Sequence, residues 1–243
     1  MKKAFTLAEV LITLGIVGVV AAMTIPSLIN YYKVKELEVR FKKADAIIQQ
    51  ALLKTANEAG YDSIQSFNIP GYSVTNENLA ELRRQVDVMN EFWLKQFVGI
   101  ERFKRDYNAY YSKRPCRTID GQIEGMFATC WYSFGTPYQL PNGMVISDLR
   151  AQYGGINHPG IIQVFFDTNG PSQGPNRWGH DIFLYSSDIT YSANGLCNPT
   201  TKNSNTNYYC YYYAHKNINP AGKNKPYWDM LFKPLSYWQK SDK

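Results

Sequence analysis

The sequence carries little charge and no excess of the residues that break regular structure. Of its 243 residues only 19% are charged, a density too low for a disordered polyelectrolyte. Seventeen glycines and twelve prolines are ordinary numbers for this length, so collagen-like and proline-rich low-complexity chains are excluded. A hydrophobic share of 44% is enough for a packed core, and the length fits one or two compact domains.

The chain also lacks the motifs that mark enzymes and structural metal sites. Its three histidines, His158, His180 and His215, are far apart in the sequence, and no H-E-x-x-H motif occurs. No C-x2-C pair, no G-x-S-x-G and no phosphate-binding loop ending in Lys-Ser/Thr is present. We therefore expect a non-enzymatic protein that needs no cofactor, with its histidines on the surface or in turns.

Positive charge is concentrated in two segments. Residues 83–117 contain nine Lys/Arg against four Asp/Glu, residues 197–243 contain seven against two, and residues 118–196 are acidic. The resulting isoelectric point near 9.0 is compatible with a nucleic-acid partner. Because no run of five like charges occurs, we interpret the excess as a solvated surface and do not expect nucleic-acid binding.

The longest apolar run lies at the N-terminus. Between Ala4 and Tyr32 the only charged residue is Glu9. The run Phe5–Ile29 contains 25 residues, and as a helix it is about 37 Å long, enough to cross a hydrocarbon core of about 30 Å. A removable secretory signal has a shorter core of about 7–15 residues, although Ala21-Ala22 resembles a cleavage site. The sequence therefore predicts a membrane anchor.

Glu9 is an unusual residue for this position, four residues into the apolar run. An unpaired charge in lipid costs at least about 3 kcal/mol, so we expect Glu9 to have a function and a partner. A free amine created by cleavage just before Phe5 would be a nearby cationic partner.

At this point the sequence matches a family. The segment Ala4-Phe5-Thr6-Leu7-Ala8-Glu9 and the apolar run behind it resemble the class III signal of type IV prepilins and type II secretion pseudopilins. The resemblance covers roughly residues 1–55, and Gly18 and Pro26 also stand where pilins commonly have a glycine and a helix-kinking proline. The family usually has glycine before the cut, and this chain has Ala4 there.

The resemblance implies processing and an assembly role for the N-terminus. A prepilin peptidase would remove residues 1–4 as a leader by cutting between Ala4 and Phe5, and the new N-terminal Phe5 would be N-methylated. Glu9 would then be the fifth mature residue, where the family carries its glutamate. In a filament it would neutralise the amine of Phe5 on an adjacent subunit, because a buried charge must be paired.

The implied fold is α+β: a pilin fold in which a long transmembrane-plus-amphipathic helix packs on a small antiparallel β-sheet head. The implied function is that of a structural subunit of a type IV pilus or a type II secretion pseudopilus. The subunit would sit in the bacterial inner membrane as a single-pass protein with its head outside the cytoplasm, and later in a periplasmic or cell-surface filament. Its partners would be homologous subunits, prepilin peptidase, the inner-membrane assembly platform and membrane lipid. The alternative is a minor pilin of a DNA-uptake filament that binds DNA through the two basic segments.

Beyond the apolar run, the periodicity predicts that the helix continues. Apolar positions recur at the 3-4 spacing of one helical face: Val34, Leu37, Phe41, Ala44, Ile48, Ala51 and Thr55. Glu36–Arg40 and Glu38–Lys42 are spaced as helical ion pairs. We therefore predict one helix of about 80 Å over residues 5–59, transmembrane over 5–29 and amphipathic over 30–59, with a bend at Pro26 and a stop at Gly60.

The remainder divides into a connecting region, residues 60–125, and a sheet with a C-terminal region, residues 126–243. In the first, the pattern predicts a helix over 76–111 with one apolar face formed by Leu79, Leu82, Val86, Met89, Phe92, Trp93 and Phe97. In the second, Tyr138–Leu140 and Met144–Ile146 flank Pro141-Asn142-Gly143 and predict a hairpin with a two-residue Asn-Gly turn. Two further strands are expected over residues 161–166 and 181–185.

Four cysteines, Cys116, Cys130, Cys197 and Cys210, are an even number in a head expected outside the cytoplasm, so we predict disulfides. Of three possible pairings we favour the sequential one, Cys116–Cys130 and Cys197–Cys210, because it closes loops of moderate size.

Two further features of this region have a structural and a functional interpretation. Asp167, Asn169 and Asp181 flank one loop and could offer oxygens to calcium, as in some pseudopilins, but the twelve-residue calcium loop with its terminal glutamate is missing, so turn formation is favoured. The tyrosine run 208–213, with Tyr227-Trp228 and Tyr237-Trp238, could form a stacking surface. We expect these aromatic side chains to pack on the sheet instead.

Overall fold

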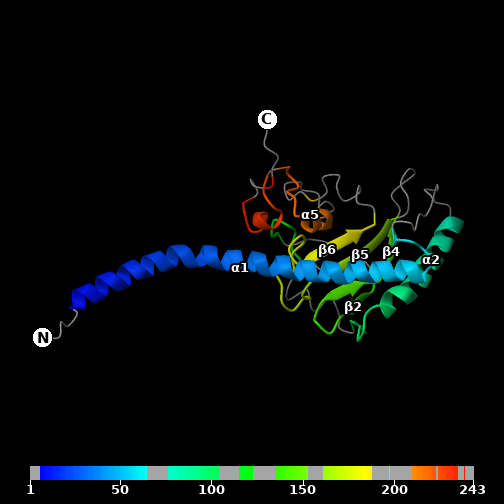
Figure 1. Cartoon of the computed structure of the whole chain (residues 1–243), viewed down its shortest axis with the longest axis horizontal. Coiled ribbons are helices and arrows are strands. Elements are labelled where there is room, and N and C mark those ends of the chain that lie inside the picture. Colours follow the sequence, from blue (N-terminus) through cyan, green and yellow to red (C-terminus); the bar gives the residue numbers. More distant parts are fainter. Residues whose placement is uncertain are drawn as a thin grey trace.

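The computed structural model describes residues 6–64, 76–103, 115–122, 135–152, 161–187, 197, 210–222, 224–234 and 238. The side chains at 76–83, 151–152 and 161 are outside this description. The fold is α+β (Figure 1): a long helix, α1 (Leu7–Glu58), projects from a head in which an antiparallel sheet and the helix α2 (Asn76–Lys95) pack against its second half. The predicted α+β arrangement is confirmed at this level.

Helix α1 is 52 residues long, which corresponds to about 78 Å. It ends where expected: Gly60 has φ of +85°, the Tyr61 N–H donates to the Ala56 carbonyl at 2.8 Å, and the Gly60 N–H donates to Asn57 at 3.1 Å. These two bonds form a Schellman C-cap, which needs a left-handed residue at the position of Gly60.

The second half of α1 is amphipathic, as predicted. All seven residues of the predicted stripe are buried. Phe41 lies at the centre of the contact between helix and head: its ring centroid is 4.6 Å from that of Phe183, 5.2 Å from Trp228 and 5.8 Å from Tyr211. The predicted ion pairs also form, Arg40–Glu36 at 2.6 Å and Lys42–Glu38 at 2.7 Å. The helix therefore joins the head through an aromatic core.

Among the described residues the sheet has six antiparallel strands: β1 (Glu101–Arg102), β2 (Pro137–Gln139), β3 (Val145–Ser147), β4 (Arg150–Gln152), β5 (Ile161–Asp167) and β6 (Ile182–Ser186). Strand β5 is central, with β6 on one edge and β3 and β4 along the other. The strands expected over residues 161–166 and 181–185 are therefore present as β5 and β6, each within one residue of its predicted bounds.

The predicted hairpin is present as β2–β3, but its turn differs from the prediction. The Leu140 N–H donates to the Met144 carbonyl at 2.8 Å, so the loop contains three residues rather than two. Among its residues only Gly143 has a positive φ, +88°. The prediction of a two-residue Asn-Gly turn was wrong because Asn142 keeps a negative φ, and Gly143 alone closes the loop.

A β-bulge separates β3 from β4. Three residues lie between Ile146 and Arg150, but only two between their partners Phe166 and Gln163. Helix α2 completes this bulge through Asn90, whose amide accepts from the Leu149 N–H at 2.6 Å and donates to the Leu149 carbonyl at 3.1 Å. The polar groups that the extra residue leaves unpaired in the ladder thus have partners.

Helix α2 is shorter than predicted. The pattern predicted a helix over 76–111, whereas α2 ends at Lys95. Gly99, with φ of +71°, turns the chain so that Glu101 and Arg102 pair with β2, and this pairing overrides the helical periodicity. The expected apolar face is buried at Val86, Met89, Trp93 and Phe97. Residues 104–111 and the side chains of Leu79 and Leu82 lie outside the described residues.

Candidate membrane-anchoring and assembly site

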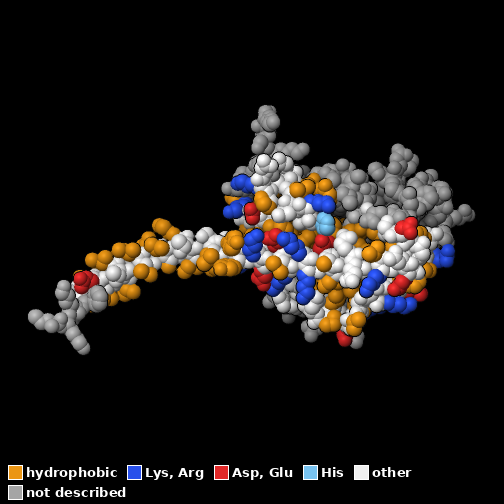
Figure 2. Space-filling model, viewed as in Figure 1, with side chains coloured by type: hydrophobic (Ala, Val, Ile, Leu, Met, Phe, Trp, Pro, Cys, Tyr) orange, Lys and Arg blue, Asp and Glu red, His pale blue; other side chains and the backbone are white. Residues whose placement is uncertain are grey.

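The first half of α1 leaves the head as a bare apolar stalk. Every described residue from Thr6 to Lys33 is exposed except the half-exposed Ala21, and Figure 2 shows hydrophobic side chains along the whole stalk. Leu7, Leu14 and Met23 are 78%, 63% and 75% exposed. A helix that is apolar all round is stable only inside a core or a membrane, and α1 is the one described helix long and apolar enough to cross a membrane.

Glu9 is held at the tip of this stalk by a capping box. Its carboxylate accepts from the Thr6 N–H and from the Thr6 hydroxyl, both at 2.8 Å, and the Thr6 hydroxyl accepts from the Glu9 N–H at 3.2 Å. The sequence contained this signal, T-x-x-E before an apolar run, but it was not used in the predictions above. Glu9 therefore has a local role, beginning the helix, in addition to the expected assembly role.

Pro26 lies inside α1 without ending it. Proline has no N–H, so the carbonyl of Ala22 loses its helical partner. The helix nevertheless continues through this point, with the Thr24 hydroxyl donating to the Val20 carbonyl and the Ser27 hydroxyl to the Thr24 carbonyl, both at 2.9 Å. Figure 1 shows a curved projecting half of α1. The structure thus gives a continuous helix, as the prediction required.

Aromatic and basic residues mark the point where the stalk meets the head. Tyr31 and Tyr32 are 57% and 63% exposed, and their rings pack edge to face at 5.9 Å. They are followed by Lys33 and Lys35, both exposed. Tyrosine followed by lysine is typical of the boundary between hydrocarbon and headgroups.

The three residues considered for calcium lie at one end of the β5–β6 pair, as predicted. Asp167 accepts backbone N–H groups from Asn169 at 3.1 Å and Gly170 at 2.8 Å through one oxygen. Both oxygens of Asp181 accept backbone bonds, from Arg177 at 2.7 Å and Asn176 at 2.8 Å. The carboxylates therefore hold the loop closed, in agreement with the interpretation as turn residues.

The same carboxylates are completely buried. Burial raises the pKa of Asp181 to about 7, and burial together with the charge of Asp181 raises the pKa of Asp167 well above its usual range. Within the described part of the chain, no group of three or more His, Cys, Asp or Glu is arranged to hold a metal ion. Calcium binding by Asp167, Asn169 and Asp181 was the less favoured interpretation of the sequence, and the structure does not test it.

The histidines have different environments. His180 is in a turn, as expected, but it is not on the surface: it is completely buried, with Nδ1 3.2 Å from the Trp178 carbonyl. Burial and the nearby Arg177 charge hold its pKa well below the usual range, so it is neutral. His215 is 36% exposed and its Nδ1 lies 2.8 Å from the Asp45 carboxylate. His158 is outside the described residues.

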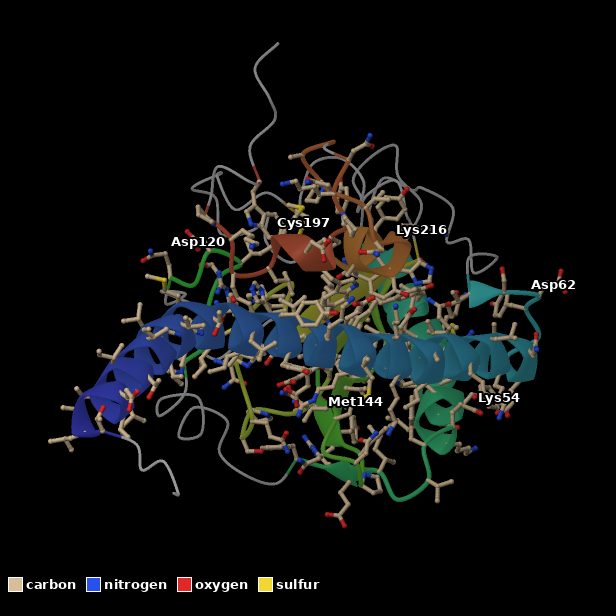
Figure 3. The ribbon with its side chains drawn as sticks, turned by 60° about the vertical axis from the view of Figure 1, so that its left-hand side comes forward. Lys54, Asp62, Asp120, Met144, Cys197 and Lys216 are labelled. Atoms are coloured by element: carbon tan, nitrogen blue, oxygen red, sulfur yellow. A yellow bond between two sulfur atoms is a disulfide. The ribbon has the colours of Figure 1, made fainter. Side chains whose placement is uncertain are left out.

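A disulfide and a short helix close the C-terminal part of the head. Cys197 and Cys210 are bonded, as Figure 3 shows, so this half of the predicted pairing is confirmed. Cys116 is disulfide-bonded too, and Cys130 lies outside the described residues. Cys210 precedes α5 (Tyr211–Lys216), a helix that the sequence analysis did not predict.

The aromatic residues of this region pack inside the head. Tyr211, Tyr213, Tyr227, Trp228 and Trp238 are buried, whereas Tyr208, Tyr209 and Tyr237 are outside the described residues. The 3-10 helix η3 (Trp228–Met230) brings Trp228 onto α1, and the Tyr211 hydroxyl donates to the Asp45 carboxylate. The packing interpretation is therefore confirmed for these five buried residues, and Tyr212 is half-buried and packs against the same core.

The predicted processing residues, Ala4 and Phe5, lie outside the described residues, as does the whole leader 1–4. Comparison with protein-family models, with curated proteins and with solved structures finds no match to this chain.

Proposed function

We propose that this chain is a non-enzymatic structural subunit of a type IV pilus or type II secretion pseudopilus, a member of the pilin-like family. A prepilin peptidase cuts between Ala4 and Phe5, Phe5 is N-methylated, and α1 anchors the subunit in the inner membrane until it enters a filament. One observation carries the proposal: a single helix is apolar and exposed over residues 6–33 and buried on one face over 34–58. Such a helix fits an anchor that is also an assembly element.

The orientation with the head outside the cytoplasm rests on the disulfide. Cys197–Cys210 is a bond typical of oxidising compartments. Positive charges point the other way, because Lys33, Lys35, Arg40, Lys42 and Lys43 follow the span whereas two lysines precede it, and flanking cations favour the cytoplasmic side. Long domains translocate largely regardless of flanking charge, so we give the disulfide more weight.

In the assembled filament the stalks of neighbouring subunits cover one another. The exposed apolar surface along residues 7–29 is then removed from lipid without being exposed to water. Glu9 is the only charge in this segment, and it pairs with the amine of Phe5 on an adjacent subunit, since an unpaired carboxylate in an apolar filament core is costly.

The capping box allows the charge of Glu9 to be tested apart from its role in the helix. Glu9→Gln keeps a residue that can complete the box but removes the charge, whereas Thr6→Val removes the cap and keeps the charge. We expect Glu9→Gln to lower filament assembly and Phe5 methylation at least about tenfold, and Thr6→Val to lower them by less, since a cap contributes about 1 kcal/mol. Equal assembly of Glu9→Gln and the wild-type chain, measured by filament shearing and by mass, would contradict the pairing role.

A further inference from the structure

Basic side chains gather where the stalk enters the head (Figure 2). We define the basic collar by its residues: Lys33, Lys35, Arg40, Lys42 and Lys43 of α1 with Lys225 and Lys233 of the segment around η3. These seven cations share residues 31–43 and 224–234 with three acids, Glu36, Glu38 and Asp229, so the two segments carry a net charge of +4. Near the C-terminal end of α1, where Figure 3 labels Lys54 and Asp62, residues 53–64 carry one lysine and two acids.

The ion pairs inside the collar leave most of this charge uncompensated. Lys35 and Lys42 share one carboxylate, that of Glu38, at 2.9 and 2.7 Å. Burial raises the pKa of Glu38, but the hydrogen bonds from Lys42 and Lys35 outweigh it, so the pKa is lowered and the group is ionised. Lys33, Lys43 and Lys233 form no ion pair with any described residue. Lys33, Lys43 and Lys233 are therefore the collar cations that can bind an anionic group next to the head.

The position of the membrane anchor determines what lies next to the collar. If the hydrocarbon span ends at Ile29, Lys33 is about 6 Å and Lys35 about 9 Å further along the helix axis. The headgroup layer extends about 5–8 Å beyond the hydrocarbon on each side, so the backbone of Lys33 lies within this layer and that of Lys35 at its outer edge, within reach of a lysine side chain. The segment around η3 is at the same end of the head, because Trp228 packs on Phe41 at 5.2 Å and Asp229 is close enough to Lys35 to raise its pKa, alongside the larger contribution of Glu38.

The rule that flanking cations stay on the cytoplasmic side of a membrane does not explain why the collar is basic. Five cations directly behind the span oppose the orientation that the disulfide supports. Phosphate-bearing lipids, in contrast, are attracted by such a cluster when it lies within about one screening length of the membrane surface.

We propose that the basic collar binds the phosphate groups of anionic phospholipids in the leaflet that faces the head, and so holds the head against the membrane before assembly. The inference rests on the membrane anchoring in the proposed function. It names the lipid class that this anchor prefers, and it assigns a role to cations that assembly through the stalk does not use.

Lysine acetylation of the full chain in lipid nanodiscs tests the collar. Rates are measured by mass spectrometry in discs of phosphatidylcholine alone and in discs with an equal part of phosphatidylglycerol. We expect phosphatidylglycerol to slow acetylation of Lys33 at least about twofold, Lys43 less, and Lys54 not at all, because attraction falls off over about 8–10 Å. The three lysines lie on one helix, so Lys54 is an internal control. Raising salt from about 0.1 M to about 1 M, which shortens the screening length to about 3 Å, should abolish the difference.

A variant pair sharpens the test. Lys33→Gln with Lys233→Gln removes two collar cations that have no described ion pair, whereas Lys54→Gln with Lys216→Gln removes the same charge elsewhere. We expect the first pair to abolish the protection of Lys43 and the second to retain it.

Each other outcome overturns the proposal in a distinct way. If the chain enters both discs and phosphatidylglycerol slows acetylation of Lys33 no more than that of Lys54, the lipid-binding role of the collar is contradicted and the anchor is not. A chain that enters neither disc contradicts the anchor, and the collar with it. Protection of Lys33 by a short DNA duplex in phosphatidylcholine discs, with none from phosphatidylglycerol, would assign the collar to nucleic acid instead.

Discussion

The two halves of α1 have the same backbone and opposite surroundings. Over residues 34–58 one face is buried against aromatic rings of the head, whereas over residues 6–33 none of the described residues of the head covers the helix. The difference lies in the pattern of side chains, a stripe in one half and apolar residues all round in the other. The difference shows that the head is stabilised by packing within the subunit, while the stalk obtains no such packing from the described residues.

The largest expected effect comes from the aromatic contact at the centre of the buried half. Phe41→Ala should lower the free energy of unfolding of the head by about 3–5 kcal/mol, because it leaves a cavity among Phe183, Trp228 and Tyr211. Leu14→Ala in the stalk should change it by less than about 0.5 kcal/mol. All five tryptophans lie in the sequence after residue 59, so urea unfolding followed by tryptophan fluorescence in detergent reports on the head alone. An equal loss of unfolding free energy in the two variants would contradict the distinction between the buried half and the exposed half of α1.

The disulfide is expected to have the next largest effect, again confined to the head. Replacing Cys197 and Cys210 by alanine opens a loop with a sequence separation of 13 and should cost about 3 kcal/mol of head stability. Retention of the chain in membranes, which depends on the stalk, should not change. Loss of membrane retention in this variant, measured by fractionation, would show that stalk and head are not independent.

Asn90 should contribute less, about 2 kcal/mol. Asn90→Ala removes both hydrogen bonds to the Leu149 backbone and leaves buried polar groups of the bulge without partners. Val88→Ala on the exposed side of the same helix, where Val88 is 43% exposed, is the control and should cost less than about 0.5 kcal/mol. A comparable loss for both variants in the same urea assay would show that the bulge does not depend on Asn90.

The smallest expected effect is a dependence of head stability on pH. The raised pKa of Asp181, about 7, means that the folded head binds a proton that the unfolded chain has released above about pH 4. This contribution to stability is complete below about pH 4 and is lost as the pH rises through about 7, and Asp167, with its pKa also raised, acts in the same direction. The lowered pKa of His180 gives the opposite contribution, present above about pH 6.5 and lost below it.

Because two carboxyls oppose one histidine, the urea midpoint should fall between about pH 4.5 and pH 6, where His180 offsets one carboxyl, and more steeply between about pH 6.5 and pH 7. His180→Gln, which removes the opposing contribution, should steepen the fall between about pH 4.5 and pH 6. A midpoint that rises between about pH 6.5 and pH 8 would exclude this assignment of protons.

Local patterns predicted α1 well and the rest of the head less well. The stripe from Val34 to Thr55 and the stop at Gly60 follow from helical period and from one glycine, both of which are local properties. The end of α2 at Lys95 depends on a strand pairing with residues 137–139, and the three-residue turn at Gly143 depends on the register of that hairpin. Neither can be read from the periodicity of one segment.

The candidate site shows the same division. Glu9, Pro26 and the exposed stalk were predicted from composition and from a family resemblance, and the capping box with Thr6 had a readable motif. The burial of His180 and the approach of the segment around η3 to Lys35 depend on long-range packing. No local sequence pattern predicts contacts between residues that are so far apart in the sequence.

The most direct test of the proposed anchor and assembly helix is the intact mass of the mature protein made with an active prepilin peptidase. The account predicts a chain that begins at Phe5, carries one added methyl group, and has lost four thiol hydrogens through two disulfides. A chain that still begins at Met1, or one cut within or directly after Ala21-Ala22 so that most of the stalk is gone, would contradict it.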